Sequence, residues 1–267
     1  MHSEGSLVDP EPPMPATIIP LSSARVLTET VLHRSAFGRT LINVASHFTL
    51  HVHRLQKGAY LACAGAPFRS LFLLSSGSAK ATRPGGDGRE QVTRFYLAED
   101  LLGLDAMDAG THPTSIRMLE YSVALEIPLP QLEQAGIDIR GLYVALIRRL
   151  SREVEYEQQT LMLLGSAKAE ERLATFLLEL GRRYAERGCS ASEYLLRMTR
   201  EDIASYLGLK LETVSRGLSR FNRTGAVEVQ GRSIRIRDPA LLERSAVWGR
   251  GDASPPARCD APLAAAS

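Results

Sequence analysis

The hydrophobic period of this chain changes once, near residue 137, and that change restricts its fold more than any other feature. From about residue 50 to 128, short runs such as SLFLLSSG and VALEIP are bounded by glycine or proline, which is typical of strands. From 137 to 165 there is no proline, and apolar residues return at steps of four and three, which indicates a long helix. With 267 residues, the chain is also longer than one core commonly supports. The sequence therefore predicts an α+β protein of at least two domains.

The strand-rich region, residues 21–136, is expected to form an antiparallel β jelly roll. Its strand-like runs recur roughly every ten residues, as they do in sandwiches and rolls. Residues 84–88 read PGGDG and supply the positive φ angles that a hairpin turn needs. Residues 1–20 and 248–267 show no period and are rich in proline or small residues, so both are expected to be disordered tails.

The long helix is expected over residues 137–167, and one of its faces carries a heptad repeat. The seam consists of Tyr143, Ile147, Leu150, Val154, Glu157, Leu161 and Leu164. A narrow seam favours contact with another helix, most simply the same helix of a second chain. The alternative is an amphipathic helix that lies on the sheet. Leu146 and Leu163, beside the seam, would pack on the roll.

Glu157 is the one charged residue of this seam. In a parallel homodimer its carboxylate would face its own copy, and like charges at close range repel. Glu157 can avoid this by pointing to solvent or by pairing with an arginine such as Arg152. The competing hypothesis is that Glu157 weakens the dimer so that another event controls assembly.

The C-terminal part, residues 168–247, has the pattern of a winged helix-turn-helix. A first helix is expected over Ala169–Arg187. Thr199 and Asp202 then approximate a capping box that starts a short helix. Gly208 allows the tight turn that leads into a second short helix.

Two alternating runs, AVEV and SIRIR, follow these helices and enclose a glycine turn, so they are expected to form a hairpin wing. Between residues 199 and 237 there are eight basic and four acidic residues, although the net charge of the whole chain is only +2. A positive module on a near-neutral chain is typical of phosphate binding to a nucleic acid.

Three polar residues, Glu212, Ser215 and Arg216, share the exposed face of the second short helix. Arginine can bond O6 and N7 of guanine, glutamate can accept from a base amino group, and serine adds a smaller contact. The alternative is that Glu212 and Arg216 form only an ion pair one turn apart. Phosphate contacts are expected from Thr199, Arg200, Lys210, Thr213, Arg220 and Arg232.

The order of roll, long helix and winged helix-turn-helix resembles the CRP/FNR family of bacterial transcription regulators. The runs AEDLLGLDAM, AEERLATFLLELGRRYAERG and MTREDIASYLGLKLETVSRGLSRF are similar to the FNR branch in particular, and the likeness covers about residues 35–245. The resemblance implies a cyclic-nucleotide-binding-like roll and a homodimer on a two-fold DNA site with TTGAT-like half-sites. In such a site Arg216 reads the guanine, Ser215 lies near a thymine and Glu212 reaches the opposite strand.

The resemblance also implies that the loop Gly103–Ser115 contacts RNA polymerase on activation. The residues assigned to that contact are Asp105, Asp108, His112 and Thr114.

Two departures from the family bear on cofactors. The oxygen-sensing branch carries cysteines before the first strand and in the sandwich, but here the N-terminal region and the run VALEIP have none. Cyclic-AMP binders carry a Gly-Glu-Leu turn and a phosphate-gripping arginine, where this chain reads Gly-Leu-Asp at 103–105 and Pro-Thr-Ser at 113–115. Arg117 is a weak substitute for that arginine. We therefore expect neither an iron–sulfur cluster nor cyclic AMP.

Histidines and cysteines offer other sensing chemistry. His51 and His53 would lie on one face of a strand, about 7 Å apart, with His47 nearby, and such a group can hold a metal or haem. The alternative is that these are solvated side chains, and we expect no metal site. Cys63 is read as a buried thiol or, alternatively, a redox sensor. Cys189 and Cys259 lie in polar segments.

The sequence leaves three classes of function to compare. The first is a DNA-binding transcription regulator, and the second is an effector protein whose roll binds a small molecule or haem, with DNA binding secondary. The third, an enzyme of the cupin type, needs histidines and a carboxylate around a metal; His112 lies in a loop beside Pro113, so no catalytic residue is expected. No signal peptide or run of about 18 apolar residues is present, which predicts a cytoplasmic protein with no membrane partner.

Overall fold

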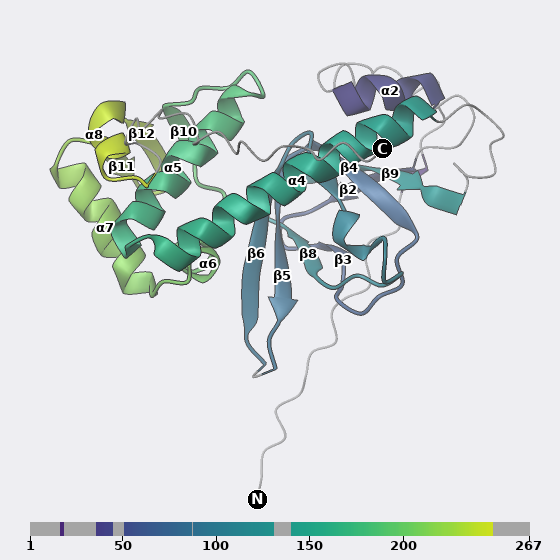
Figure 1. Cartoon of the computed structure of the whole chain (residues 1–267), viewed down its shortest axis with the longest axis horizontal. Helices are drawn as coiled ribbons and strands as arrows, with labels where there is room; N and C mark the ends of the chain where they lie inside the picture. Colours follow the sequence, from purple (N-terminus) through teal and green to yellow (C-terminus); the bar gives the residue numbers. More distant parts are fainter. Residues whose placement is uncertain (1–16, 19–35, 45–50, 87, 131–139, 248–267) are drawn as a thin grey trace, which may run out of the picture.

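Two antiparallel sheets form the roll in the computed structural model, which describes residues 17–18, 36–44, 51–86, 88–130 and 140–247 (Figure 1). The five-stranded sheet has the order β1 (Thr17–Ile18), β2 (His51–Leu55), β9 (Ser122–Pro128), β4 (Ser70–Ser76) and β7 (Leu101–Leu102). The four-stranded sheet has the order β3 (Tyr60–Ala62), β8 (Ser115–Met118), β5 (Ser78–Pro84) and β6 (Glu90–Leu97). A 3₁₀ turn, η2 (Leu104–Ala106), follows β7. The expected antiparallel roll is confirmed.

The period-two pattern of the strands divides their side chains between two apolar layers. Because successive side chains of a strand point to opposite faces, Ala124 of β9 is buried between the sheets with Leu74 and Ile116. Leu125 and Ile127 of the same strand pack on the outer face, under the helices. Between β4 and β5 the chain turns at Gly77, where φ is +91° and a Cβ would lie 2.2 Å from Ser122 Oγ.

Two elements at the N-terminal end were not expected. Thr17 and Ile18, assigned from the sequence to a disordered tail, form β1 and pair with β2. That part of the prediction is wrong, because an exposed sheet edge offers backbone hydrogen bonds to any short extended segment. Helix α2 (Ala36–Val44) buries Phe37 and Leu41 against α4. The other residues of the predicted tails, 1–16, 19–20 and 248–267, lie outside the described residues.

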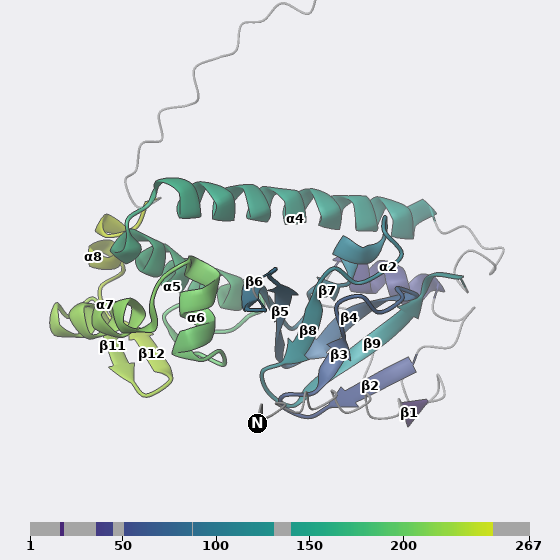
Figure 2. The same cartoon turned by 90° about the horizontal axis from the view of Figure 1, so that it is seen from below.

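Helix α4 (Arg140–Ser166) matches the predicted long helix and runs along the roll to the C-terminal domain (Figure 2). Its buried residues are Leu142, Leu146 and Leu163. Leu146 packs on the roll as expected, whereas Leu163 lies in the apolar cluster formed mainly by the C-terminal domain. Neither α4 nor any other helix in the described part of the chain is long and apolar enough to span a bilayer.

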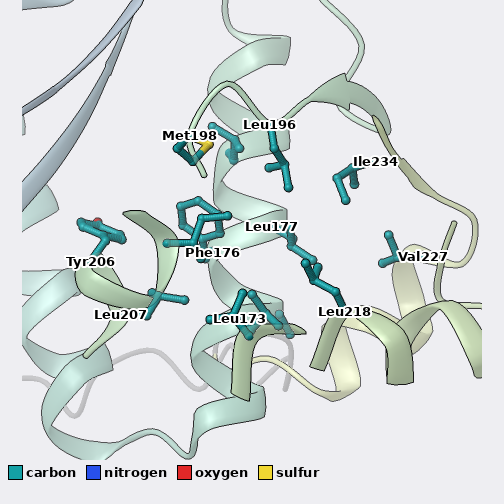
Figure 3. Packing of buried hydrophobic residues seen from close by; sticks show 14 of the residues in the cluster. Leu173, Phe176, Leu177, Leu196, Met198, Tyr206, Leu207, Leu218, Val227 and Ile234 are labelled. Atoms are coloured by element: carbon teal, nitrogen blue, oxygen red, sulfur yellow. The ribbon is translucent and has the colours of Figure 1, made fainter. Parts of the chain in front are cut away.

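The C-terminal domain consists of α5 (Ala169–Ala185), β10 (Glu193–Leu195), α6 (Arg200–Leu207), α7 (Leu211–Arg223), β11 (Val227–Gln230), β12 (Ser233–Ile236) and α8 (Pro239–Arg244). Leu173, Phe176 and Leu177 of α5 pack in one apolar cluster with Leu218 of α7 and Ile234 of β12 (Figure 3). The winged helix-turn-helix is present as expected. Strand β10 extends the wing to three strands by pairing with β12.

The two domains share one apolar core and one buried ion cluster. Phe95 of β6 lies 6.0 Å from Phe176 of α5 between ring centroids. At the turn after β6, the Asp100 carboxylate accepts hydrogen bonds from Arg149 (2.6 Å), Arg183 (2.6 Å) and Arg187 (2.7 Å). Burial alone would raise the pKa of Asp100, but the three guanidinium groups hold it well below its ordinary value.

Candidate nucleic-acid interface

The first helix of the pair, α6, is fixed at both ends by local chemistry. The Thr199 hydroxyl accepts a hydrogen bond from Asp202 N at 3.1 Å, and Asp202 Oδ2 accepts from Thr199 N at 2.9 Å. This completes the predicted capping box. At the other end Gly208 takes a left-handed conformation with φ +61°, and Leu209 N donates to Ala204 O. The turn therefore leads directly into α7.

Helix α7 separates a buried face from a polar face. Val214, Leu218 and Phe221 are at most 2% exposed, whereas Glu212 and Arg216 are exposed and Ser215 is half-buried. No ion pair joins Glu212 to Arg216 among the residues that the structure describes, so the alternative of a simple pair one turn apart is not observed. Each of these side chains is available to a partner.

The hydroxyl of Ser215 is oriented from the neighbouring helix. Arg200, the first residue of α6, directs Nη1 to Ser215 Oγ at 3.4 Å. Arg200 itself remains exposed. The N-terminal ends of α6 and α7 thus meet on one surface, where a backbone phosphate and a base edge can be contacted together.

Acidic residues neutralise some of the basic side chains of this module. Arg220 pairs with Glu170 of α5 at 2.8 Å, and Glu228 pairs with both Arg235 and Arg237 of the wing. The bases from 199 to 237 with no acidic partner in the described part of the chain are Arg200, Lys210, Arg216, Arg223 and Arg232.

The structure shows how exposed each of the predicted phosphate contacts is. Thr199, Arg200, Lys210, Arg220 and Arg232 are exposed, and Thr213 is half-buried. Arg223 was not among them, yet it is exposed on the last turn of α7 and has no acidic partner in the part of the chain that the structure describes. Its spacing from Arg216 and Arg220, at steps of four and three, was the signal that could have identified it.

The heptad seam of α4 is largely exposed on the single chain. Tyr143, Ile147, Val154 and Leu161 are between 50% and 68% exposed, and Glu157 is exposed without an ion pair in the described residues. Leu150 and Leu164 are half-buried. The helix therefore packs one face on the roll, as in the second alternative, and leaves most of the seam open to solvent.

Two of the four residues predicted to contact RNA polymerase are exposed, and the other two are buried. Asp105 and Asp108 are exposed, whereas His112 and Thr114 are 5% and 6% exposed. His112 packs edge-on against Phe68, and Thr114 donates to Asp105 at 2.9 Å. His112 and Thr114 therefore help to build the loop from inside, and Asp105 and Asp108 are its surface residues among the four predicted contacts.

The histidines of β2 contact a carboxylate that the sequence did not single out. His53 Nε2 lies 2.8 Å and His51 Nδ1 lies 3.3 Å from Glu126 Oε2. The hydrogen bond with His53, aided by Ser70, lowers the pKa of Glu126 to about 2. The described residues contain no group of three His, Cys, Asp or Glu side chains suited to a metal ion. His47 lies outside the described residues.

Free thiols are found at two of the three cysteines. Cys63 is half-buried and Cys189 is exposed, and Cys259 lies outside the described residues. Neither has a neighbour that forms a disulfide within the described residues.

A cavity of about 770 Å³ lies between the β5–β6 strands, the β7–β8 loop and α4. Its walls include Tyr96, Thr114, Leu150 and Tyr156. Arg117, considered as a substitute phosphate ligand, instead donates to Gly58 O at 2.9 Å.

Comparison with known proteins identifies the family of both domains. Residues 52–136 match the model of the cyclic nucleotide-binding domain, and residues 171–245 match the Crp-like helix-turn-helix domain. The chain is 40% identical over 216 residues to the fumarate nitrate reduction regulatory protein of Klebsiella oxytoca, covering 76% of this chain and 86% of that one. It is also 40% identical over 188 residues to the transcriptional activator protein anr of Pseudomonas aeruginosa, covering 70% and 77%.

A solved structure shares the architecture. FixK2 from Bradyrhizobium japonicum superimposes with a TM-score of 0.67 at 29% identity, covering 74% of this chain and 98% of that one. This chain therefore resembles members of one family both in its architecture and in its sequence. This chain belongs to the CRP/FNR family and is a transcriptional regulator with a helix-turn-helix DNA-binding domain.

Proposed function

We propose that this chain acts as a homodimer that binds a two-fold, TTGAT-like DNA site and reads it with Glu212, Ser215 and Arg216. The observation that carries the proposal is the arrangement of α7, which is anchored by its buried face while these three side chains stay free of one another. An arginine at this place can bond a guanine through two hydrogen bonds, and a glutamate can accept from a base amino group.

Phosphate contacts set the register of this helix on the duplex. The residues that we assign to them are Thr199, Arg200, Lys210, Thr213, Arg220, Arg223 and Arg232. Their charge attracts any DNA sequence, so they contribute affinity and a strong dependence on salt. Base choice is left to the three side chains of α7.

The exposed seam of α4 supports the homodimer. Four large apolar side chains in one line along a helix are a costly surface for a single chain in water, and a second copy would cover them by knobs-into-holes packing. Glu157, exposed within the seam, would meet its own copy there. We retain the hypothesis that it weakens the dimer, so that Glu157→Ala raises the dimer fraction in sedimentation.

Binding of the purified chain to fluorescent duplexes tests the proposal. One duplex carries two TTGAT-like half-sites in two-fold symmetry, and a second of equal length and composition carries them scrambled. We expect a dimer on the first duplex and much weaker, salt-sensitive binding on the second. Binding as a monomer with equal affinity for both duplexes would contradict it.

We infer a further contact with RNA polymerase through Asp105 and Asp108, the exposed residues of the β7–β8 loop. The name of the Pseudomonas relative, a transcriptional activator, favours activation, and such an activator works in the cytoplasm. The variant Asp108→Ala is expected to keep its DNA affinity and to lose stimulation in a purified transcription assay. Unchanged stimulation in Asp105→Ala and Asp108→Ala would remove this role.

The cavity beside α4 favours a second candidate function, the binding of a small-molecule effector by the roll. It is large enough for a nucleotide-sized ligand, although the arginine that would grip a cyclic phosphate is absent from residues 113–115. Calorimetry with cyclic AMP and the visible spectrum of freshly purified protein test the nucleotide and haem versions. Heat release or a Soret band would support an effector role.

A further inference from the structure

The β-roll of this chain holds the helix-turn-helix of the same chain through the strand pair β5–β6. Lys80 of β5 donates from Nζ to Asp202 Oδ1 at 2.6 Å. Asp202 is only 8% exposed, and its other oxygen closes the capping box of α6. One carboxylate therefore both starts the DNA-binding helix pair and attaches it to the roll.

A second attachment lies one turn further along α6. Val92 N of β6 donates to Ser205 Oγ at 2.9 Å, and the Gln91 side-chain amide donates to Ser205 O. Thr82 and Arg83 of β5 pair with these two residues across the strands. Thus α6 is held at its beginning and near its end by one rigid strand pair, an arrangement that fixes its direction. Figure 1 shows α6 beside β6.

Aromatic packing adds a third contact beside these two attachments. The rings of Phe95 and Tyr206 lie 5.2 Å apart between centroids, and the Tyr206 hydroxyl lies 2.8 Å from that of Tyr156 on α4. The helix that positions α7 is thereby connected to the long helix as well as to the roll.

From these contacts we infer that Lys80 is a positioning residue for DNA binding: through Asp202 it sets the orientation of α6 and α7 relative to α4. Burial alone would raise the pKa of Asp202, but hydrogen bonds from Lys80 and Thr199 hold it below its ordinary value, so the Asp202 carboxylate is charged at neutral pH. The inference rests on the proposed homodimer. Two recognition helices that bind one duplex must lie roughly 34 Å apart. This spacing depends on how α6 and α7 of each chain are oriented relative to α4.

The consequence differs between DNA sites with one and two half-sites. A single helix-turn-helix can bind one half-site at any angle to its roll. Simultaneous binding of two half-sites requires both helix pairs in the correct orientation, because the second contact is intramolecular and is lost when geometry forbids it. Loss of the Lys80 contact should therefore weaken the two-half-site complex selectively.

The variant Lys80→Met, which keeps the apolar stem and removes the charge, tests this in the full-length chain. We expect affinity for the two-half-site duplex to fall about tenfold, within the range of typical coupling between sites. Affinity for a duplex with one half-site scrambled should change by less than about twofold. Lys80→Arg should restore most of the loss, and the dimer mass in sedimentation should not change.

Two further variants separate positioning from charge and from stability. Lys57→Met removes the same charge from an exposed position of the roll and should leave both affinities unchanged. Ser205→Ala removes the hydroxyl that accepts from Val92 N, weakens the second attachment without removing charge, and should cause a smaller selective loss of the same kind, which keeps the test available if Lys80→Met does not fold.

Equal loss on both duplexes, or no loss on either, overturns the inference, because a purely structural lysine would lower the melting temperature without altering the ratio of the two affinities. The proposed homodimer is tested first, on the wild-type chain alone. If the wild-type chain binds two half-sites no more tightly than one, the homodimer is contradicted, and the inference that rests on it falls before any variant is measured.

Discussion

Arginine side chains gather in two regions of this molecule, and their surroundings differ. At the domain junction Arg149, Arg183 and Arg187 converge on the buried carboxylate of Asp100. On α7 the arginines follow one exposed face, and two of the three have no acidic partner in the described residues. A cation whose charge is matched in a buried site can hold two domains together, whereas an exposed and unmatched cation remains available to a phosphate or a base.

The largest effect is expected for Asp100→Ala, which tests the buried region by leaving three arginines near the domain junction without their counter-ion. Breaking a buried ion pair by removing one partner typically costs about 3–5 kcal/mol, so we expect the free energy of unfolding to fall by about that amount. Urea denaturation measures it. Because the folded pKa of Asp100 is lowered, its contribution should be complete above about pH 4 and be lost as the pH falls below that value.

The matched control for this variant is Asp108→Ala, at an exposed carboxylate with no ion pair in the described residues. Surface substitutions of this kind usually change stability by less than about 0.5 kcal/mol. If both variants unfold at the same urea concentration, the arginine cluster does not hold the domains together.

The next largest effect is expected at the exposed face. Arg216→Ala should weaken binding to the two-half-site duplex by about 1–3 kcal/mol and relax the preference at one base pair per half-site. Titrations against duplexes substituted at each position locate that base pair. A variant that loses affinity equally for every sequence would show that Arg216 contacts phosphate instead of a base.

Local patterns in the sequence predicted much of this interface. The capping box of Thr199 and Asp202, the turn at Gly208 and the buried face of α7 each depend on residues a few positions apart, and all three are present. Spacing along one helix decides which residues share a face, so the sequence alone places Glu212, Ser215 and Arg216 together on the polar face of α7.

Contacts between distant residues could not be predicted in this way. Asp100 meets its arginines 49, 83 and 87 residues away, and Lys80 meets Asp202 122 residues away. Burial of His112 depends on the ring of Phe68, which belongs to another segment of the roll. Such pairings follow from the packing of distant segments, and the spacing of residues along the sequence does not indicate which distant segments will pack together.

A smaller and different effect is expected at Arg223, a cation on the last turn of α7 with no acidic partner in the described residues. Arg223→Ala should weaken binding to all duplexes by a similar factor. The slope of log K against log salt should become less steep by about one, because one phosphate contact is removed. Fluorescence anisotropy at several salt concentrations measures this. A loss confined to the TTGAT-like site would instead place Arg223 among the base contacts.

The smallest effect concerns Arg220, which lies between the two kinds of surroundings because its guanidinium is exposed but paired with Glu170. A phosphate that approaches Arg220 must compete with this carboxylate, and exposed pairs of this kind are worth about 0.2–1 kcal/mol. Glu170→Gln keeps the shape of the side chain and removes the competing charge. We expect it to strengthen binding to every duplex slightly, most clearly at low salt, where exposed charges are least screened. In the double variant Glu170→Gln with Arg220→Ala the gain should disappear, since there is no longer a cation to release. A gain that survives in the double variant would mean that Glu170 repels the DNA directly and that its pairing with Arg220 does not limit binding.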